Sequence, residues 1–384
     1  MITNGIKFKN FRIHRKSSKI KKILESVLKT NNSILQSLKD NYKNSYDLRK
    51  FKKFKKFQNL RLIGMGGSSL GVKAIHSFLQ DKIRKKFIFI DNLDLNLKKI
   101  RNQKFLNLII SKSGETIETI VNCNILINKS DKNIFITENN KNYLSKLAEK
   151  LKAEVVQHND FIGGRYSVLS ETGMLPAELM GLSPKKFRQL NNLVKNKKYL
   201  NALISNVNSI LFFIKKKKYN SIILNYDPKS EDLFYWYQQL VAESLGKSKK
   251  GLLPIISNMP KDNHSVMQLY LDGFENNFFT FFHVKENNSS KIINKTILNS
   301  KNYLKNKKLK DIIFAQKRAT ENIFDKKNIP YRSFEILKRD EKTLGELFNF
   351  FILETILLSK AMNLNPYNQP AVELIKNQTK IILS

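Results

Sequence analysis

The sequence lacks three features that would place it in a specialised class of protein. It contains a single cysteine, Cys123, which excludes an internal disulfide and fits a reducing cytosol. Its longest apolar stretches, such as residues 352–358, are well short of the ~20 residues that a membrane-spanning helix needs. Residues 1–16 include basic side chains but no apolar segment of the kind found in a signal peptide. We therefore expect a soluble, cytoplasmic protein with no membrane partner.

Acidic side chains are scarce compared with basic ones. The chain has 32 Asp and Glu residues against 69 Lys and Arg residues, which gives a formal net charge of +37. Such an excess is typical of proteins that bind nucleic acid. The lysines, however, run along the whole chain without forming a confined basic stripe, and they accompany abundant asparagine and isoleucine. We interpret the charge as a solvated surface that attracts an anionic substrate, and we expect no nucleic-acid partner.

A metal-ligand pattern is also missing. The histidines are scattered along the chain without the short spacings of a metal site. They are His14, His76, His158, His264 and His283. We therefore expect no metal site.

Apolar runs alternate with helical patterns in two successive parts of the chain, whose 384 residues suffice for two domains. In the first part we predict strands at 60–63, 87–90, 106–110, 133–137 and 154–156, and helices at 69–80, 114–127 and 143–151. After a helical connector at 184–218, we predict strands at 221–226, 252–257, 278–284 and 329–337, and helices at 232–245, 264–272, 300–321 and 344–361.

Alternation of strand and helix is typical of parallel sheets covered by helices on both faces. We therefore predict an α/β fold with two doubly wound domains and mainly parallel sheets, over residues 58–200 and 201–362. A helical N-terminal extension over 1–57 precedes them, and a C-terminal tail over 363–384 follows. Because the ligands of such sheets bind at the carboxyl ends of strands, the loops at those ends are the candidate sites.

The first of these loops is the glycine-rich run Gly64–Ser69, which lies between an apolar run and a helical pattern. Free backbone N–H groups at a helix N-terminus favour an anion. A dinucleotide fingerprint needs glycine where Ser69 stands, and a P-loop needs lysine where Val72 stands. A cradle for a small anion such as a sugar phosphate and a plain tight turn both remain open.

Two further loops have related chemistry. The predicted strand 106–110 runs into Ser111–Thr116, with the sequence Ser-Lys-Ser-Gly-Glu-Thr, and a helix follows. Hydroxyls, one glycine and a helix start again suit a phosphate. The run Asp160–Ser170 contains paired glycines, which let the backbone approach a ligand, and Arg165, which supplies a fixed positive charge.

These runs resemble, in order, the motifs of the phosphoglucose isomerase family. The resemblance rests on the Gly-Gly-Ser loop, on Ser-Lys-Ser-Gly-Glu-Thr and on Asp-Phe-Ile-Gly-Gly-Arg-Tyr-Ser at 160–167, and matching motifs extend from about 60 to 376. It implies two sugar-isomerase (SIS) domains. It also implies the reversible isomerisation of glucose 6-phosphate and fructose 6-phosphate through a cis-enediol intermediate, in glycolysis and gluconeogenesis. This reaction requires no cofactor and no metal.

The resemblance implies catalytic residues in three more segments. Gln239–Lys247 is similar to the segment that holds the family's base, which corresponds to Glu243. Lys261–Ser265 is similar to the histidine loop and gives His264, although Asn263 stands where glutamine is usual. Pro366–Lys376 is similar to the C-terminal signature, although Ala371 stands where glycine is usual.

The implied roles follow from the chemistry of the isomerisation. Glu243 moves the proton between C1 and C2, His264 and Lys376 assist ring opening, and Arg165 favours the charge that develops on the enediolate oxygen. The implied substrate-binding residues are Gly67, Ser68, Ser111, Lys112, Ser113, Thr116, Gly164 and Gln369. The resemblance also implies a homodimer in which His264 enters the site of the neighbouring subunit.

Other functions fit parts of the pattern. A related SIS isomerase would also accept mannose 6-phosphate. A regulatory SIS protein would bind a sugar phosphate without catalysis and would have no need of Glu243, His264 or Lys376. A nucleic-acid binder would show tight, salt-sensitive binding to DNA and no isomerase activity. A dehydrogenase fits least well because of Ser69.

Overall fold

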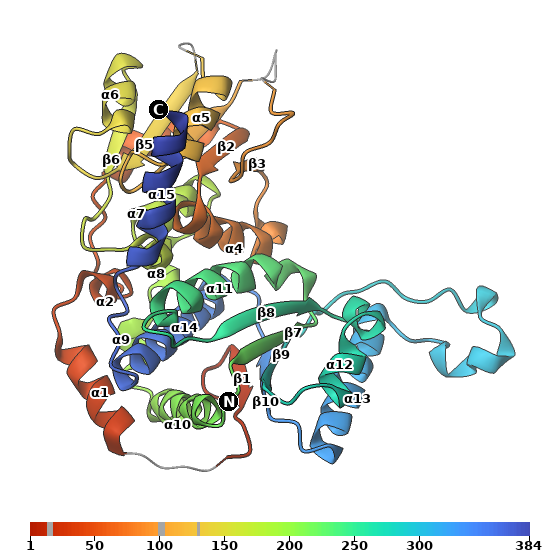
Figure 1. The fold of residues 1–384 in the computed structure, drawn as a ribbon. Helices are drawn as coiled ribbons and strands as arrows, with labels where there is room; N and C mark the ends of the chain where they lie inside the picture. Colours follow the sequence, from red (N-terminus) through yellow and green to blue (C-terminus); the bar gives the residue numbers. More distant parts are fainter. Residues whose placement is uncertain (14–17, 99–103, 129–130) are drawn as a thin grey trace.

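Two five-stranded sheets organise the part of the chain that the structure describes (Figure 1). The structure is a computed structural model that describes residues 1–13, 18–98, 104–128 and 131–384. The two mainly parallel sheets confirm the predicted α/β fold. Of the histidines discussed above, His14 lies outside the described residues.

The first sheet has the strand order β3-β2-β4-β5-β6, and all its strands are parallel. Its strands are β2 (Asn59–Gly64), β3 (Lys86–Ile90), β4 (Leu106–Ile110), β5 (Lys132–Thr137) and β6 (Glu154–Gln157). Every residue of the central strand β4 is buried, as expected where helices cover both faces. The helices of this part are α4 (Leu70–Phe78), α5 (Ile117–Leu126), α6 (Tyr143–Lys150) and α7 (Glu171–Leu179), and its 3₁₀ helices are η2 (Gly66–Ser68), η3 (Gln80–Lys82) and η4 (Gly164–Leu169).

The second sheet has the order β1-β10-β9-β7-β8 and is parallel except for β1. Its strands are β1 (Ile6–Lys9), β7 (Asn220–Asn225), β8 (Leu253–Asn258), β9 (Asn277–Val284) and β10 (Tyr331–Ile336). Its helices are α10 (Lys197–Lys215), α11 (Glu231–Leu245), α12 (Met267–Asp272), α13 (Leu309–Lys326) and α14 (Glu341–Ala361), with η5 (Pro228–Ser230) and η6 (Lys261–His264). The short helices α8 (Pro184–Phe187) and α9 (Leu190–Leu193) lead into α10.

The N-terminal segment differs from the predicted helical extension over 1–57. It begins with β1, which pairs antiparallel with β10, so that Ile6 lies opposite Ile336. Ile6 is fully buried and Phe8 packs on Phe334, with ring centroids 4.7 Å apart. Covering the edge of β10 in this way satisfies its backbone groups and leaves the four-residue strand β1 at the edge of the sheet. Helices follow only later, as α1 (Ser18–Lys29), α2 (Ser33–Ser37), α3 (Leu48–Phe51) and η1 (Lys52–Lys56).

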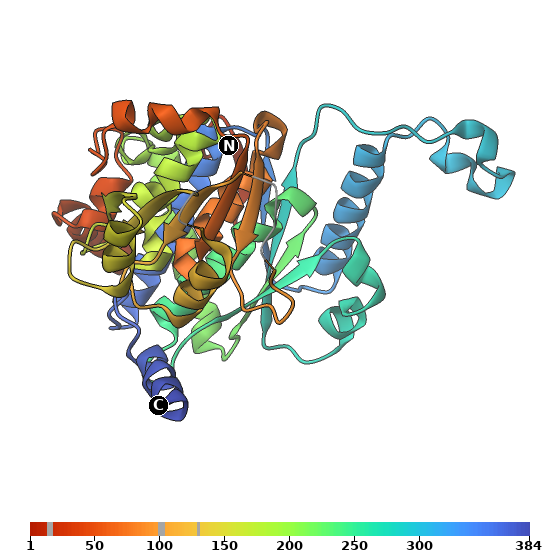
Figure 2. The ribbon, with the colours of Figure 1, turned by 90° about the horizontal axis from the view of Figure 1, so that it is seen from above.

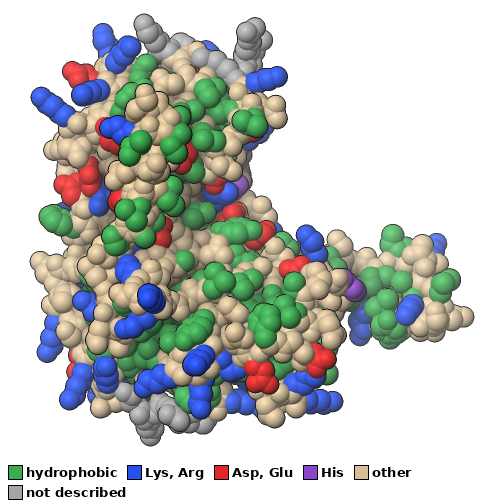
Figure 3. Space-filling view, in the orientation of Figure 1, with side chains coloured by type: hydrophobic (Ala, Val, Ile, Leu, Met, Phe, Trp, Pro, Cys, Tyr) green, Lys and Arg blue, Asp and Glu red, His purple; other side chains and the backbone are tan. Residues whose placement is uncertain are grey.

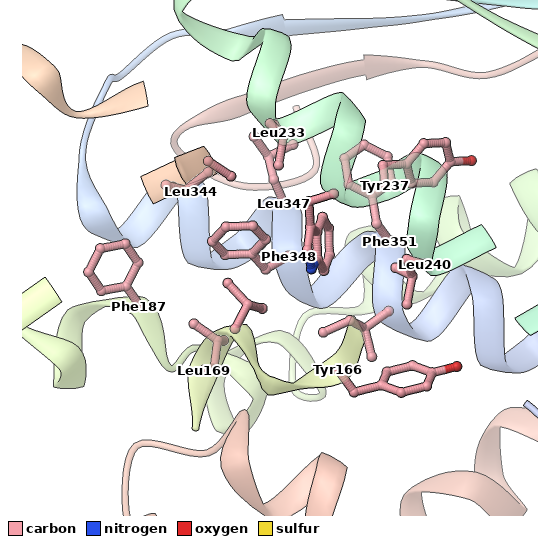
Figure 4. Close-up of a cluster of buried hydrophobic side chains, with 14 of the residues drawn as sticks. Tyr166, Leu169, Phe187, Leu233, Tyr237, Leu240, Leu344, Leu347, Phe348 and Phe351 are labelled. Carbon is pink, nitrogen blue, oxygen red and sulfur yellow. The ribbon is translucent and has the colours of Figure 1, made fainter. Parts of the chain in front are cut away.

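Helix α14 packs against β10 of the second sheet and is buried along almost its whole length. Leu344, Leu347, Phe348 and Phe351 are fully buried and pack against residues of α11 and η4 (Figure 4). Each such side chain contributes about 1.5–3 kcal/mol by leaving water. The packing fixes η4, where the backbone carbonyl of Arg165 accepts a hydrogen bond from the Trp236 indole at 3.1 Å. The core therefore holds together the elements that carry the candidate site.

Two segments project from the body. Helix α15 (Pro370–Leu383) has no buried residue and points away from both sheets in Figure 2. The segment 285–308 extends as a long arm between β9 and α13, with the 3₁₀ helices η7 (Asn294–Thr296) and η8 (Asn299–Leu304), where one helix over 300–321 was expected. Apolar side chains gather on the arm in Figure 3. Leu298, within the arm segment, is 76% exposed. None of the helices in the described ranges is both long and apolar enough to span a lipid bilayer.

Candidate active site

The two serine-bearing loops lie side by side at the carboxyl edge of the first sheet. The register of β2 and β4 places Gly64 opposite Ile110, so that the chain leaves both strands at the same level. Beyond them, Ser68 ends η2 and is half-buried, whereas Ser111 is only 2% exposed. Both loops lead into helix N-termini, where unpaired N–H groups favour an anion.

The start of α5 keeps its hydrogen-bonding groups available. The Ser111 hydroxyl pairs with the Thr116 hydroxyl at 2.9 Å, and Thr116 stands at the N-cap position without capping the helix through its side chain. One turn further on, the buried Thr119 hydroxyl has no hydrogen-bond partner among the described residues. Buried polar groups are nearly always paired, so the unpartnered hydroxyl suits a polar ligand. The uncapped start of the helix suits the same kind of ligand, such as a phosphate.

Lys112 and Ser113 make different contacts. The Lys112 ammonium donates to the backbone carbonyl of Asp160 at 2.7 Å and lies 3.3 Å from a Glu138 carboxylate oxygen, so this side chain ties the loop to the run that precedes Gly163. Ser113 is exposed, and its hydroxyl accepts a hydrogen bond from the Glu115 N–H at 3.3 Å.

Two glycines let the first loop touch η4. A Cβ placed on Gly67 would lie 2.2 Å from the backbone carbonyl carbon of Gly164. That distance is far inside van der Waals contact, so only glycine fits. The Ser167 hydroxyl lies 2.7 Å from the Gly164 carbonyl oxygen and 3.4 Å from that of Gly67. The first loop and η4, which carries Arg165, therefore form one surface.

Arg165 is the centre of the site. Its side chain is 1% exposed, yet it carries a full positive charge. Nη1 donates to a Glu243 carboxylate oxygen at 3.0 Å and to the Gln369 side-chain oxygen at 2.7 Å. Nε donates to the Ser244 hydroxyl at 2.9 Å, and Nη2 to the carbonyls of Pro366 at 2.6 Å and of Asn368 at 3.2 Å.

The tyrosine next to Arg165 shares two of its hydrogen-bond partners. The Tyr166 hydroxyl donates to the Pro366 carbonyl at 3.1 Å and pairs with the Ser244 hydroxyl at 2.9 Å. Burial raises the pKa of Tyr166 to about 12, so its hydroxyl keeps its proton at neutral pH.

Glu243 lies on α11 with its carboxylate held from two sides. One oxygen accepts from Arg165, and the other accepts from the Gln239 side-chain amide at 2.9 Å. The side chain of Glu243 is 27% exposed, so a ligand can still reach it. A carboxylate oriented by two donors can take up a proton and return it to a neighbouring atom.

Two predicted catalytic residues are not joined to this cluster within the chain. His264 ends η6 and is exposed, and its side chain makes no hydrogen bond or ion pair with any described residue. Lys376 lies on the exposed helix α15, where its ammonium is 2.7 Å from the Glu373 carboxylate. The structure therefore brings Arg165, Glu243 and Gln369 together but leaves His264 and Lys376 outside. Within the described ranges, no three His, Cys, Asp or Glu side chains are grouped so that they could hold a metal ion.

The family model for phosphoglucose isomerase matches residues 14–384. The chain belongs to the phosphoglucose isomerase family. It is 32% identical over 345 residues to the glucose-6-phosphate isomerase of Methanocaldococcus jannaschii, covering 85% of this chain and 84% of that protein. It is 30% identical over 407 aligned positions to the glucose-6-phosphate isomerase of Campylobacter jejuni, with 100% of both chains covered. These matches confirm the family inferred from the motifs.

The solved structures agree on the fold of this phosphoglucose isomerase family member. A hypothetical protein from Thermus thermophilus superposes with a TM-score of 0.81 at 21% identity, covering 96% of this chain and 94% of that chain. This likeness supports the predicted α/β fold with two mainly parallel sheets.

Gln239 is a site residue that sequence reasoning missed in this family member. Its amide nitrogen contacts Glu243, and a Cβ placed on Gly66 would lie 2.9 Å from that nitrogen. Its side-chain oxygen is buried with no partner among the described residues, so it can accept a hydrogen bond from a ligand. The available signal was its position four residues before Glu243, which places both side chains on one face of a helix.

Proposed function

We propose that the chain is an aldose–ketose isomerase that interconverts glucose 6-phosphate and fructose 6-phosphate, with Glu243 as the proton shuttle. The reaction moves one proton between C1 and C2 of the open-chain sugar through a cis-enediol intermediate. The observation that carries this proposal is the Arg165–Glu243 pair. It sets a base and a fixed positive charge 3.0 Å apart at the junction of the two sheets.

The pair supplies complementary chemistry. Glu243 takes the proton from one carbon and returns it to the next, while charge builds up on the enediolate oxygen. Arg165 is already held in place by its backbone partners, so it stabilises that charge without reorganising. A positioned base gives ~10²- to 10⁴-fold in rate, and orientation and electrostatics supply the rest.

The phosphate is held by the two loops of the first sheet. Ser68, Ser111, Ser113 and Thr116 offer hydroxyls, and the backbones of Gly67 and Lys112 offer N–H groups. The Gly164 backbone acts with Arg165 on the enediolate oxygen. The pairing of Ser111 with Thr116 and the uncapped start of α5 support this assignment. Gln369, held by Arg165, then lies on the side of the sugar.

The remaining two residues fit a homodimer. His264 is exposed and unpaired in the described part of the chain, as expected of a side chain that completes the site of a second copy. Lys376 lies on α15, whose exposed apolar residues, such as Leu374 and Ile375, also need a partner surface. We place His264 and Lys376 in ring opening within this dimer, which would act in glycolysis and gluconeogenesis in the cytoplasm, without a cofactor or nucleic-acid partner.

A coupled assay tests the function. The purified chain with fructose 6-phosphate, EDTA, glucose-6-phosphate dehydrogenase and NADP⁺ should produce NADPH, because the isomerase supplies glucose 6-phosphate without a metal. No turnover of fructose 6-phosphate by the folded protein would contradict the proposal. Mannose 6-phosphate in a parallel assay measures substrate breadth, and sedimentation velocity tests the dimer.

A further inference from the structure

A strained turn follows the helix that carries Glu243. Lys247 and Lys250 form an isolated antiparallel bridge, with backbone hydrogen bonds of 3.1 and 2.9 Å between them. The two residues between them, Ser248 and Lys249, have φ angles of 52° and 57°. A two-residue turn with both central residues in the left-handed region favours Asn and Gly, so this sequence makes it at a cost. Strain of this kind persists where surrounding contacts fix it, often at functional sites.

Both lysines at the base of the turn bind the same piece of chain. The Lys247 ammonium donates to the carbonyl of Asn365, and the Lys250 ammonium donates to the carbonyl of Met362 at 3.2 Å. These carbonyls belong to Met362–Gln369, which we call the strap. The strap joins α14 to α15, so the turn holds the chain at the point where it leaves the core.

The strap also contacts Arg165. The guanidinium donates to the carbonyls of Pro366 and Asn368 and to the side chain of Gln369. The same guanidinium binds Glu243. A shift of the strap therefore moves the partners that fix Arg165, and with them the geometry of the Arg165–Glu243 pair.

We propose that Lys247 is a positioning residue for the isomerisation, which together with Lys250 holds the strap where Arg165 and Gln369 are aligned with Glu243. The inference rests on the proposed function, because the alignment matters for turnover only if these groups act on one substrate. Lys247 itself acts through the strap and the arginine and does not contact the reacting carbons.

The surroundings of Lys247 make its hydrogen bond to the Asn365 carbonyl sensitive to pH. Burial and the neighbouring Arg165 lower the pKa of Lys247 to about 8, whereas Glu243 acts in the opposite direction. As the pH rises through this value, the ammonium loses its charge and its hydrogen bond to Asn365 weakens. The other titratable groups around the turn and the strap are Lys249, Lys250, Tyr166, Lys360 and Tyr367.

Three variants of the enzyme test the proposal. We expect Lys247→Met to lower kcat by about 10-fold and to change KM by less than about twofold, because small misplacements of catalytic groups slow the chemical step. Lys247→Arg keeps charge and donors, so it should restore most of kcat and move the alkaline fall in kcat from about pH 8 to higher pH. The control is Lys249→Met, on the same turn, whose side chain is exposed and has no partner among the described residues. It should behave as wild type.

Hydrogen–deuterium exchange of the strap amides gives a readout that does not depend on turnover. We expect exchange over 362–369 to be at least about threefold faster in Lys247→Met at an unchanged melting temperature. If the wild-type chain fails to isomerise fructose 6-phosphate, the proposed function fails. The exchange measurement still reports whether the lysines of the turn hold the strap. Wild-type kcat, pH profile and strap exchange in Lys247→Met would overturn the inference. A loss matched by Lys249→Met, or explained by a lower melting temperature alone, would also overturn it.

Discussion

Replacing Arg165 with alanine should separate binding from catalysis. Its guanidinium makes one hydrogen bond from Nε, two from Nη1 and two from Nη2, five in all, at 2.6 to 3.2 Å. Removing one partner of a buried ion pair costs about 3–5 kcal/mol. Because the Glu243 side chain is 27% exposed and water can enter, we expect the free energy of unfolding to fall by about 3 kcal/mol, at the low end of that range.

The effect on turnover should be larger than the effect on substrate affinity. Deleting one preorganised donor to a developing oxyanion costs ~10²- to 10³-fold in kcat. We therefore expect Arg165→Ala to lower kcat by at least ~10²-fold while KM for fructose 6-phosphate changes by less than about threefold. The assay measures initial rates well below the melting temperature of the variant. Arg49→Ala is the control, because that side chain is 92% exposed. Equal weakening of KM and kcat would refute the reasoning and show that Arg165 only binds.

Three further predictions concern packing and protonation. Gly67→Ala would place a Cβ 2.2 Å from the facing backbone, so we expect kcat/KM to fall by at least ~10²-fold. The control is Gly163→Ala, which should keep most of its activity because its Cβ would have no neighbour nearer than 3.9 Å. Arg332→Met leaves the fully buried Glu354 without its ion-pair partner, so the free energy of unfolding measured in urea should fall by about 3–5 kcal/mol. Adding Glu354→Leu should recover most of this loss. An unchanged free energy of unfolding in the single variant would contradict the prediction. Burial lowers the pKa of His158 to about 4, so the unfolded chain binds a proton more readily than the folded one, and stability should fall as the pH drops from about 6.5 towards 4. His158→Asn should remove up to ~1.4 kcal/mol per pH unit of that slope, and an unchanged slope would exclude this residue as its source.

The two mainly parallel sheets could be predicted because apolar runs mark buried strands. Every residue of Leu106–Ile110 is buried, and each is either apolar or hydrogen-bonded through its side chain. The run ends at Ser111, where the candidate phosphate loop begins. Hydrophobic periodicity and motif order were therefore enough to locate the strands and the loops at their ends. Conversely, β1 could not be predicted from its own residues. Four residues of mixed character form a strand only because the distant β10 offers an open edge.

Part of the candidate site followed from the sequence, whereas the contacts that join its residues did not. The motifs singled out Arg165, Glu243 and Gln369, and the fold places one guanidinium against the other two. The spacing of four residues placed Gln239 and Glu243 on one helix face, although it did not show that the amide would bind the carboxylate. Nothing in the sequence indicated that Lys247 would bind the strap. The Lys247 contact joins segments more than a hundred residues apart in the sequence, a separation that side-chain patterns do not encode.

The most direct test of the account is the rate at which a folded Glu243→Gln variant equilibrates fructose 6-phosphate and glucose 6-phosphate. Glutamine keeps the size of the side chain and its contact with Arg165 but cannot carry a proton between carbons. The account predicts a kcat at least ~10²-fold below wild type at an unchanged melting temperature, with Glu25→Gln on the exposed face of α1 as a fully active control. A Glu243→Gln enzyme with wild-type turnover would contradict it.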